Sequence, residues 1–413
     1  MTSKTRLELG AMSVLAAMTC GAPAVYGQMA AGDSGARPVI LTFSYTGELV
    51  HNAGGGARRG TTFAGAAGGE VTLLLGRLVA WHGARIFVFA LGTHGGAPSD
   101  LVGDVQGVSN LEAPTKVRLE EAWLQQNLLD NRLSWLVGRY DLNTEFYRLQ
   151  SGALFINSSF GIGPEFAHSG VAGPSTFPNT AVGTRVDFKP SPNVVWRAAV
   201  LDGVPVDRPG DGTRVFASGD GALLVGEVAL LARPDTVGVP RQRRFGIGRG
   251  RTRPYRGKLA IGAWYYTARF SDLVDTLPNG ASVQHRGSGG VYLIGDLTVR
   301  SLTAFAQLGL GDGRVNQISG YVGGGFTLTA PFSSRAQDAL GLAVAAARNG
   351  SHYERAQTAG GPAAGETSVE LTYLAQLGSW LTVQPDVQYV IHPGGTRATR
   401  NAVVPGLRIA VSH

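Results

Sequence analysis

Residues 140–180 read YDLNTEFYRLQSGALFINSSFGIGPEFAHSGVAGPSTFPNT and lie between two segments with the pattern of β-strands. The stretch is several times longer than the usual connection, and its Gly, Pro, Ser and Asn residues argue against a long helix or strand. It nevertheless carries many large apolar side chains, among them Phe146, Phe155 and Phe166. Apolar side chains are costly in water, whereas unpaired backbone groups are costly in a dry core. A wide, water-filled β-barrel meets both demands, so we expect residues 141–179 to fold into its lumen as a constriction loop.

The segments on both sides of this loop have the length of tilted strands that cross a membrane. Polar Glu366 and Glu370 alternate with apolar Val369 and Leu371, which is typical of a strand with one wet face and one lipid face. The connections alternate between short and long, as in barrels whose short turns are periplasmic. We therefore predict an all-β transmembrane outer-membrane β-barrel of about 16 antiparallel strands, with a long inward-folded loop. The predicted strands are residues 38–51, 69–81, 84–94, 117–129, 132–140, 180–189, 193–202, 220–233, 257–270, 288–299, 301–310, 317–330, 337–347, 365–378, 380–391 and 400–412.

The composition agrees with an exported membrane barrel. The chain has 413 residues, 60 of them Gly, and only 16% are charged, which is low for a soluble surface. No apolar run after the N-terminal region is long enough for a transmembrane helix. Residues 1–27 have the basic start, apolar middle and small-residue end of a secretory signal peptide. We expect residues 28–37 to be a short linker and residues 38–413 to be a single barrel in the bacterial outer membrane, in contact with lipid, lipopolysaccharide and the barrel assembly machinery.

One connection that should be a short periplasmic turn is long instead. Residues 234–256 contain many arginines and, from residue 236 on, no acidic residue. We interpret this segment as a solvated insertion, and a cell-wall contact through Arg241–Arg256 stays open. We do not expect nucleic-acid binding, because the segment lacks the aromatic strand positions and the known modules of such proteins.

Enzyme signatures are weak in this sequence. There is no phosphate-binding loop and no nucleophile elbow, and the histidines are scattered without ligand spacing. We therefore expect no catalytic residues, no cofactor and no metal, although a barrel hydrolase stays a formal alternative.

Several motifs in order resemble one family, the OprB-type carbohydrate-selective porins. They include GDVQGVSN at 103–110, GRYDLNTEF at 138–146, FINSSFG at 155–161 and WLTVQPD at 380–386. The resemblance spans nearly the whole chain after the signal peptide. It implies a sixteen-strand outer-membrane barrel that passes small sugars by passive diffusion.

A sugar channel needs lumen side chains that replace part of the solute's water. Arginine offers a fixed fork of donors and carboxylates offer acceptors, while aromatic faces cover apolar surface. The candidates from strands are Arg85, Arg118, Arg139, Arg185, Arg197 and Arg408, with Glu120 and Glu227 as acidic partners. The candidates from the loop are Arg148, Asn157, Phe160, Glu165 and His168.

Each candidate also has a purely structural interpretation. The arginines could pair with acids in the barrel wall and affect only stability. The loop phenylalanines are more typical of anchors that pin the loop to the wall. Four further aromatic residues are candidates for a girdle at the membrane interface: Trp123, Trp135, Trp264 and Tyr389.

Two further rival functions remain at this point, besides the barrel hydrolase. A basic lumen would concentrate anions, so the chain could be an anion-selective porin for organic acids or phosphate. It could also be a structural barrel, closed by its loop, that binds the cell wall.

Overall fold

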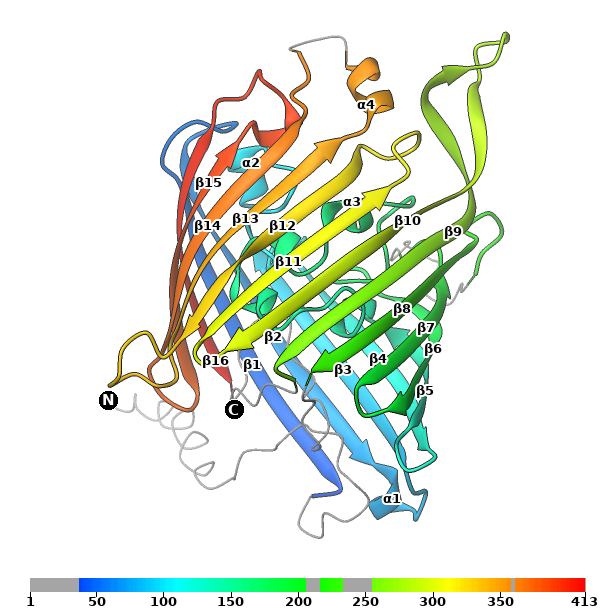
Figure 1. Ribbon diagram of the computed structural model, residues 1–413, viewed down its shortest axis with the longest axis vertical. Helices are drawn as coiled ribbons and strands as arrows, with labels where there is room; N and C mark the ends of the chain where they lie inside the picture. The colour runs from blue at the N-terminus through cyan, green and yellow to red at the C-terminus, as the bar shows by residue number, and fades with distance from the viewer. Residues whose placement is uncertain (1–36, 206–215, 233–254, 358–360, 413) are drawn as a thin grey trace, which may run out of the picture.

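The computed structural model describes residues 37–205, 216–232, 255–357 and 361–412, and it is a closed antiparallel β-barrel of sixteen strands (Figure 1). Each strand pairs with the next, and β16 pairs with β1 to close the cylinder. The predicted fold class is confirmed. The strands are β1 (Val39–Asn52), β2 (Gly60–Leu74), β3 (Ala84–Gly95), β4 (Lys116–Leu128), β5 (Leu133–Tyr140), β6 (Ala181–Ser191), β7 (Val194–Asp202), β8 (Ala222–Ala232), β9 (Gly257–Thr276), β10 (Ser282–Val299), β11 (Leu302–Gly311), β12 (Ile318–Thr329), β13 (Ala339–Asn349), β14 (Gly365–Gln376), β15 (Leu381–Ile391) and β16 (Ala402–Ser412).

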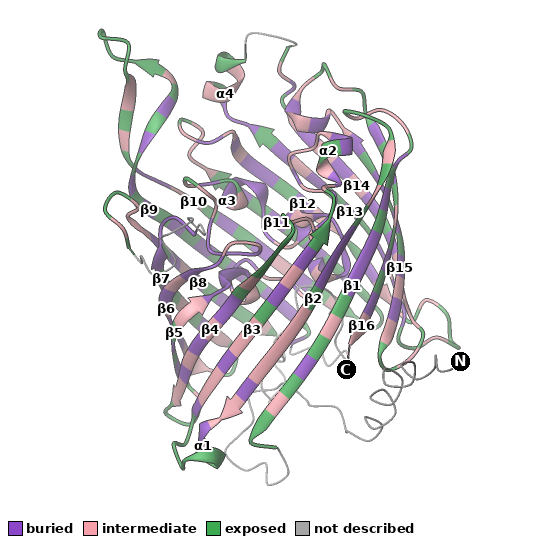
Figure 2. Cartoon of the chain, turned by 180° about the vertical axis from the view of Figure 1, so that it is seen from behind, coloured by how far each residue is buried: buried purple, intermediate pink, exposed green. Residues whose placement is uncertain are grey.

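The strands alternate between an outer apolar face and a buried inner face (Figure 2). On β9, Leu259 and Ile261 are exposed on the outside, whereas Lys258 and Ala260 are buried. Side chains on a strand point to opposite faces in turn, so this pattern follows directly from the sequence. The residues of Glu366–Leu371 obey it as predicted, with Glu366 and Glu370 buried and Leu371 exposed.

Two predicted boundaries were wrong. The sequence predicted a strand over 69–81, but β2 begins at Gly60 and ends at Leu74, followed by the short helix α1 (Leu75–Leu78). Residues 60–68 have few large apolar side chains, and they form a strand because they pair with Ser44–Asn52 of β1. The predicted loop over 271–287 is mostly strand, because β9 and β10 stay paired up to Thr276 and Ser282.

The two ends of the barrel differ. Short turns lie at the end where β1 starts and β16 finishes, and the β9–β10 hairpin and helix α4 (Ser351–Ala356) lie at the opposite end (Figure 1). Outer-membrane barrels keep their short turns in the periplasm, so α4 faces the cell exterior. The signal peptide over 1–27 and most of the Arg-rich insertion over 234–256 lie outside the described residues. Among the described residues, no helix has the length and apolar character needed to cross a bilayer.

The connection from β5 to β6 runs through the inside of the barrel. It contains four short helices: η1 (Leu142–Thr144), η2 (Gly152–Leu154), η3 (Ser158–Phe160) and α3 (Pro164–Ala167). Between them, its backbone and side chains bond to wall residues of β8, β10, β12, β14 and β15. A segment that touches so many strands around the cylinder must lie within it.

A second loop also enters the lumen, which the sequence did not predict. The β3–β4 connection, residues 96–115, carries helix α2 (Ser99–Val102). Its Gln106 bonds to β13 and β14, and its Ser109 bonds to Glu48 of β1. The two loops also bond to each other, because the Ser158 amide donates to the Gly107 carbonyl.

Glycine makes room for the inserted loop on the inner face of β11–β13. A Cβ at Gly309 would lie 1.9 Å from Glu165 Oε1, and a Cβ at Gly341 would lie 2.8 Å from Leu154 and Phe155 atoms. Real Cβ atoms do not approach so closely, so a side chain at either position would collide with the docked loop. Part of the high glycine content therefore serves to admit the loop.

Candidate permeation site

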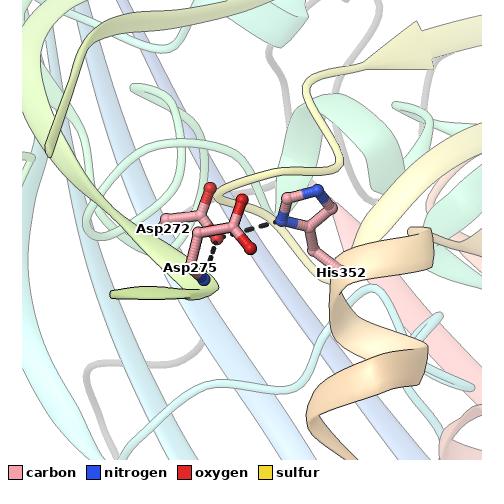
Figure 3. A group of neighbouring side chains, drawn as sticks. All are labelled: Asp272, Asp275 and His352. Atoms are coloured by element: carbon pink, nitrogen blue, oxygen red, sulfur yellow. Dashed lines mark hydrogen bonds and ion pairs between the residues drawn. The ribbon is translucent and has the colours of Figure 1, made fainter. Parts of the chain in front are cut away.

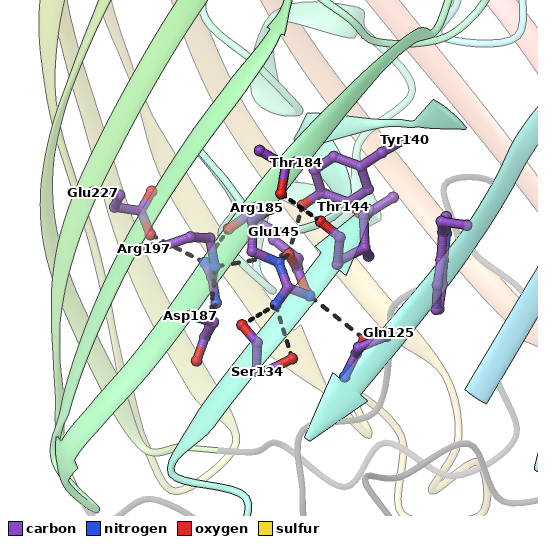
Figure 4. Close-up of polar contacts among 12 residues, drawn as sticks. Gln125, Ser134, Tyr140, Thr144, Glu145, Thr184, Arg185, Asp187, Arg197 and Glu227 are labelled. Atoms are coloured by element: carbon purple, nitrogen blue, oxygen red, sulfur yellow. Dashed lines mark hydrogen bonds and ion pairs between the residues drawn. The ribbon is translucent and has the colours of Figure 1, made fainter. Parts of the chain in front are cut away.

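A continuous set of polar side chains lines the inner wall on one side of the barrel. We call it the polar ladder, and it crosses β3, β4, β6, β7, β8 and β9 and includes one loop residue. Figure 4 shows its part from Gln125 of β4 to Glu227 of β8. Its members are Arg85, Gln125, Glu145, Arg185, Asp187, Arg197, Glu227 and Lys258.

Arg185 joins the wall to the start of the inserted loop. Its Nη1 donates to the carbonyl and hydroxyl oxygens of Ser134 at 3.1 and 2.9 Å, and its Nε lies 2.8 Å from Glu145 Oε2. Its Nη2 lies 3.5 Å from Gln125 Oε1, which also accepts from Arg85 Nη2 at 2.7 Å. The guanidinium therefore holds the loop through a charge-assisted contact, the stronger class of hydrogen bond.

Arg197 continues the ladder toward β8. Its Nη2 and Nε donate to Asp187 Oδ2 at 2.6 and 3.1 Å, and its Nη1 donates to the Glu145 carbonyl at 2.8 Å. The same Nη1 lies 3.7 Å from Glu227 Oε1, which is 3.1 Å from Lys258 Nζ. Each carboxylate therefore has a cation beside it.

Glu227 is a buried carboxylate that joins the barrel wall to the loop through hydrogen bonds. Its Oε2 accepts from the Tyr147 amide at 2.9 Å and from the Tyr292 hydroxyl at 2.8 Å. Lys258 Nζ, which pairs with the other oxygen, also donates to the Arg148 carbonyl at 2.9 Å. The side chain of Glu227 is buried, so these partners replace the water that a carboxylate needs.

The charges of the ladder's ion pairs balance. Arginine and lysine are counted here as cations and carboxylates as anions. The cations Arg185, Arg197 and Lys258 are matched by Glu145, Asp187 and Glu227.

Only part of the ladder is accessible to a solute. The side chain of Glu145 is 23% exposed and that of Arg197 is 14% exposed, against 2% for Arg185 and 1% for Glu227. Arg85 is half-buried, with its Cζ 5.4 Å from the centre of the Trp123 ring. Glu145 and Arg197 are thus the accessible acceptor and donor of the ladder.

Carboxylates on the opposite wall hold both inserted loops by their backbone amides. Glu370 accepts from the Ile156 and Asn157 amides at 2.7 and 2.9 Å. Glu366 accepts from the Val105 and Gln106 amides of the second loop at 2.8 and 3.0 Å. The alternation of β14 predicts that both acids face the lumen. It does not predict that they accept hydrogen bonds from the loops, because their partners are distant in sequence.

Several predicted site residues brace the loops. Arg118 donates to the carbonyls of Pro178 and Pro114, at 2.8 and 3.0 Å, and so ties the two loops together. Arg408 on β16 donates to Glu48 and to Asn110.

Other predicted residues are anchored deep inside the barrel. Asn157 caps η3 by accepting from the Ser159 amide, and it donates to Gln388. Glu120 is buried, and its carbonyl accepts from the Thr180 hydroxyl. His168, at the end of α3, differs from them because it is exposed.

Only two of the four aromatic residues predicted for the interfacial girdle lie on the outer face of the barrel. Phe160 is buried against Phe155 and Phe305, as expected for an anchor. Trp264 faces inward and stacks on Phe166 with ring centres 4.3 Å apart, and a second aromatic pair of the inner wall is Phe87 with Trp123. Trp123 and Trp264 are therefore not girdle residues, whereas Trp135 and Tyr389 are exposed on the outer face.

The prediction that Arg139 faces the lumen was wrong. Arg139 pairs with Ala122 and Val182 in the sheet, and this register places it on the same outer face as Trp135. Its guanidinium donates to the Thr180 carbonyl at 2.6 Å, at the end of the inserted loop. The inner positions of β5 are taken by Ser134, Leu136 and Tyr140, so the parity of the strand decided the outcome.

Comparison with known proteins identifies the family. The family model described as "Carbohydrate-selective porin, OprB family" matches residues 58–412. The chain belongs to the OprB family. Porin B of Pseudomonas aeruginosa is 25% identical over 324 residues, which cover 71% of this chain and 67% of Porin B.

Solved structures agree on the fold of this OprB-family barrel. The high-pH structure of Pseudomonas putida OprB has a TM-score of 0.78 at 21% identity and covers 91% of this chain and 94% of its own. The outer-membrane channel DcaP of Acinetobacter baumannii has a TM-score of 0.55 at 12% identity, covering 91% and 97%. The chain is thus an outer-membrane barrel of a porin family, and the family and fold indicate a channel rather than an enzyme.

Glu165 of the inserted loop gives this OprB-family barrel a testable pH response. Burial raises the pKa of Glu165 to about 7, from an ordinary 4.5, although Tyr147 donates to Oε1 at 2.9 Å. Between pH 4.5 and 7, the carboxyl of Glu165 is therefore protonated when the loop is docked and ionised when the loop is released. Docking is strongest below pH 4.5 and weakens as the pH rises through about 7.

We expect open-channel current noise to increase as the pH is raised from about 5.5 to 8.5, because ionised Glu165 loosens α3. Single-channel recordings measure this noise directly. Glu165→Gln keeps a hydrogen-bond acceptor for Tyr147 but has no proton to lose, so its noise should not change with pH. Equal pH dependence in the two proteins would show that another group is responsible.

Proposed function

We propose that this barrel lets small neutral sugars diffuse across the outer membrane, and that residues 141–180 narrow the path. The charge balance of the ion pairs in the polar ladder is the observation that supports a neutral solute. Unpaired cations would favour anions, but Arg185, Arg197 and Lys258 each lie beside a carboxylate. Membership of a carbohydrate-selective family supports the same conclusion.

The accessible ladder residues suit hydroxyl groups. Glu145 offers an acceptor and Arg197 offers donors, and both are partly exposed. A hydroxyl both donates and accepts, so one sugar can contact the two residues in turn as it gives up water. Even a hydrogen bond to an ionised group contributes only about 1.5–3 kcal/mol net, which allows the sugar to leave again, as conduction requires. Arg85 and Arg148 are further proposed contacts along this path.

We expect ion conductance in planar bilayers to fall as a small sugar is added, because the sugar occupies the narrow part of the channel. Glu145→Gln removes a charged acceptor, and Arg197→Lys removes the two-atom contact with Asp187. Each change should weaken sugar block by about tenfold or more, since a hydrogen bond to a charged group contributes roughly 1.5–3 kcal/mol.

Asp312→Asn is the matched control, because Asp312 pairs with Arg314 in the outer β11–β12 connection. It should leave sugar block unchanged. Strong anion selectivity without sugar block would reject the proposal in favour of an anion porin.

We further propose that the exposed apolar face of the barrel contacts outer-membrane lipid and lipopolysaccharide and is inserted by the barrel assembly machinery. The segment 241–256, for which a contact with the cell wall was left open, falls almost wholly outside the described residues.

A further inference from the structure

Two aspartates and two histidines meet at the outer end of the barrel, away from the lumen ladder. Asp272 and Asp275 lie near the end of β9, His285 lies on β10, and His352 lies on α4. Figure 3 shows Asp272, Asp275 and His352 turned toward one another. His352 Nδ1 is 2.9 Å from Asp272 Oδ1, and His285 Nε2 is 2.8 Å from Asp272 Oδ2.

We propose that Asp272, Asp275 and His352 form a binding site for one divalent transition-metal ion of the Zn²⁺ class. The site would link the projecting β9–β10 hairpin to helix α4, two parts of the chain that already lie against each other. No step of sugar permeation depends on it.

The spacing of the donor atoms supports this assignment. One ligand atom from each of the three residues lies within 4.8 Å of the other two. Zinc ligands sit roughly 2.0–2.2 Å from the ion in a tetrahedron, so their mutual separation is about 3.5 Å. Asp275 is exposed, and a change in its side-chain rotamer is enough to close the remaining gap. The fourth position would be taken by water.

The donor types select the class of ion. Imidazole nitrogen suits Zn²⁺, Cu²⁺ and Ni²⁺, whereas Ca²⁺ and Mg²⁺ prefer oxygen ligands alone. On binding, the proton between His352 Nδ1 and Asp272 Oδ1 is displaced to solvent, and Nδ1 donates its lone pair to the ion.

His285 has a supporting position. It contacts Asp272 Oδ2, which leaves Oδ1 directed toward His352. Hydrogen-bond partners of this kind orient a metal-binding carboxylate and affect its affinity. The backbone amides of Val274 and Asp275 also donate to Asp272 Oδ1, both at 2.9 Å. The carboxylate is thus held in place before any ion arrives.

The test is isothermal titration of the tag-free, chelator-treated barrel in detergent with ZnCl₂ at pH 7.5. We expect one ion per chain, with binding at least about tenfold weaker in His352→Ala and Asp275→Ala. His285→Asn should weaken binding by roughly tenfold through its effect on Asp272. Co²⁺ in place of Zn²⁺ should give the visible absorption of a four-coordinate ion, which the His352→Ala protein lacks.

His82→Gln is the control, because His82 is exposed in the connection that follows α1, and α1 and α4 lie at opposite ends of the barrel (Figure 1). It should bind Zn²⁺ like the unchanged protein. An absence of stoichiometric binding, or binding that His352→Ala and Asp275→Ala leave intact, would overturn the proposal. All variants are first checked for the folded barrel by their mobility on unheated gels.

Discussion

Replacing residues 141–180 by a two-residue turn is expected to increase single-channel conductance several-fold and to abolish sugar block. The replacement is possible because Tyr140 and Ala181 are direct partners in the β5–β6 ladder, so a tight turn can close the hairpin there. The strands on both sides keep all their pairings. The channel widens because, in the unchanged protein, the loop crosses the lumen from β5 to β15 and back.

The barrel should survive this change. Its sixteen strands form a closed ladder without the loop, and the wall carboxylates that lose loop amides gain water. Conductance in planar bilayers and the size limit for sugars in liposome swelling are the measurements. A mobility shift between heated and unheated samples confirms that the barrel has folded.

The projecting hairpin provides a matched control. Thr276 and Ser282 are also partners in the sheet, so residues 277–281 can be replaced by a two-residue turn in the same way. This shortening lies outside the lumen and should leave conductance and sugar block unchanged. If removal of residues 141–180 changed conductance no more than this control did, the loop would not be the constriction.

Glu227→Ala is expected to destabilise the barrel by about 3–5 kcal/mol, the cost of removing one partner of a buried ion pair. Lys258 and Arg197 both lose a carboxylate, and the Tyr147 amide and Tyr292 hydroxyl lose their acceptor. The lumen also gains a positive charge, so the channel should become anion-selective.

Urea unfolding of the barrel in liposomes measures the change in stability, and the reversal potential in a salt gradient measures selectivity. Glu227→Gln separates the two effects, since it keeps an acceptor but removes the charge. It should shift the reversal potential like Glu227→Ala but cost less stability. Wild-type selectivity in both variants would show that the ladder does not control the charge of the path.

The sequence predicted the strands best where the two faces differ most. On β14, acids alternate with apolar residues, and the predicted orientation was correct. On β9 the two faces differ less in polarity, because inward Trp264 packs against Phe166 of the loop and is apolar like the outer face. Arg139 was assigned to the wrong face because a single arginine near a strand end gives no register by itself.

The individual site residues were predicted less well than the inserted loop. Arg185, Arg197 and Glu227 meet in one ladder, but Gln125, Glu145, Asp187 and Lys258 were missed. Asp187 became recognisable only when the paired register placed it opposite Arg197, and Lys258 only when the fold brought its Nζ to 3.1 Å from Glu227 Oε1. The sequence held one indication of their place, because both residues occupy strand positions that alternate onto the inner face. Apolar residues at other inner positions obscured this alternation.

The sequence by itself determined the closed barrel, its lipid-facing surface and the presence of a long apolar segment between β5 and β6, because period-two alternation and turn residues are local properties. Only the tertiary structure decided which charges pair across neighbouring strands, which glycines admit the loop, and that residues 96–115 enter the lumen as well. Those outcomes depend on the register and curvature of sixteen strands together, so they bring into contact residues that no local pattern connects.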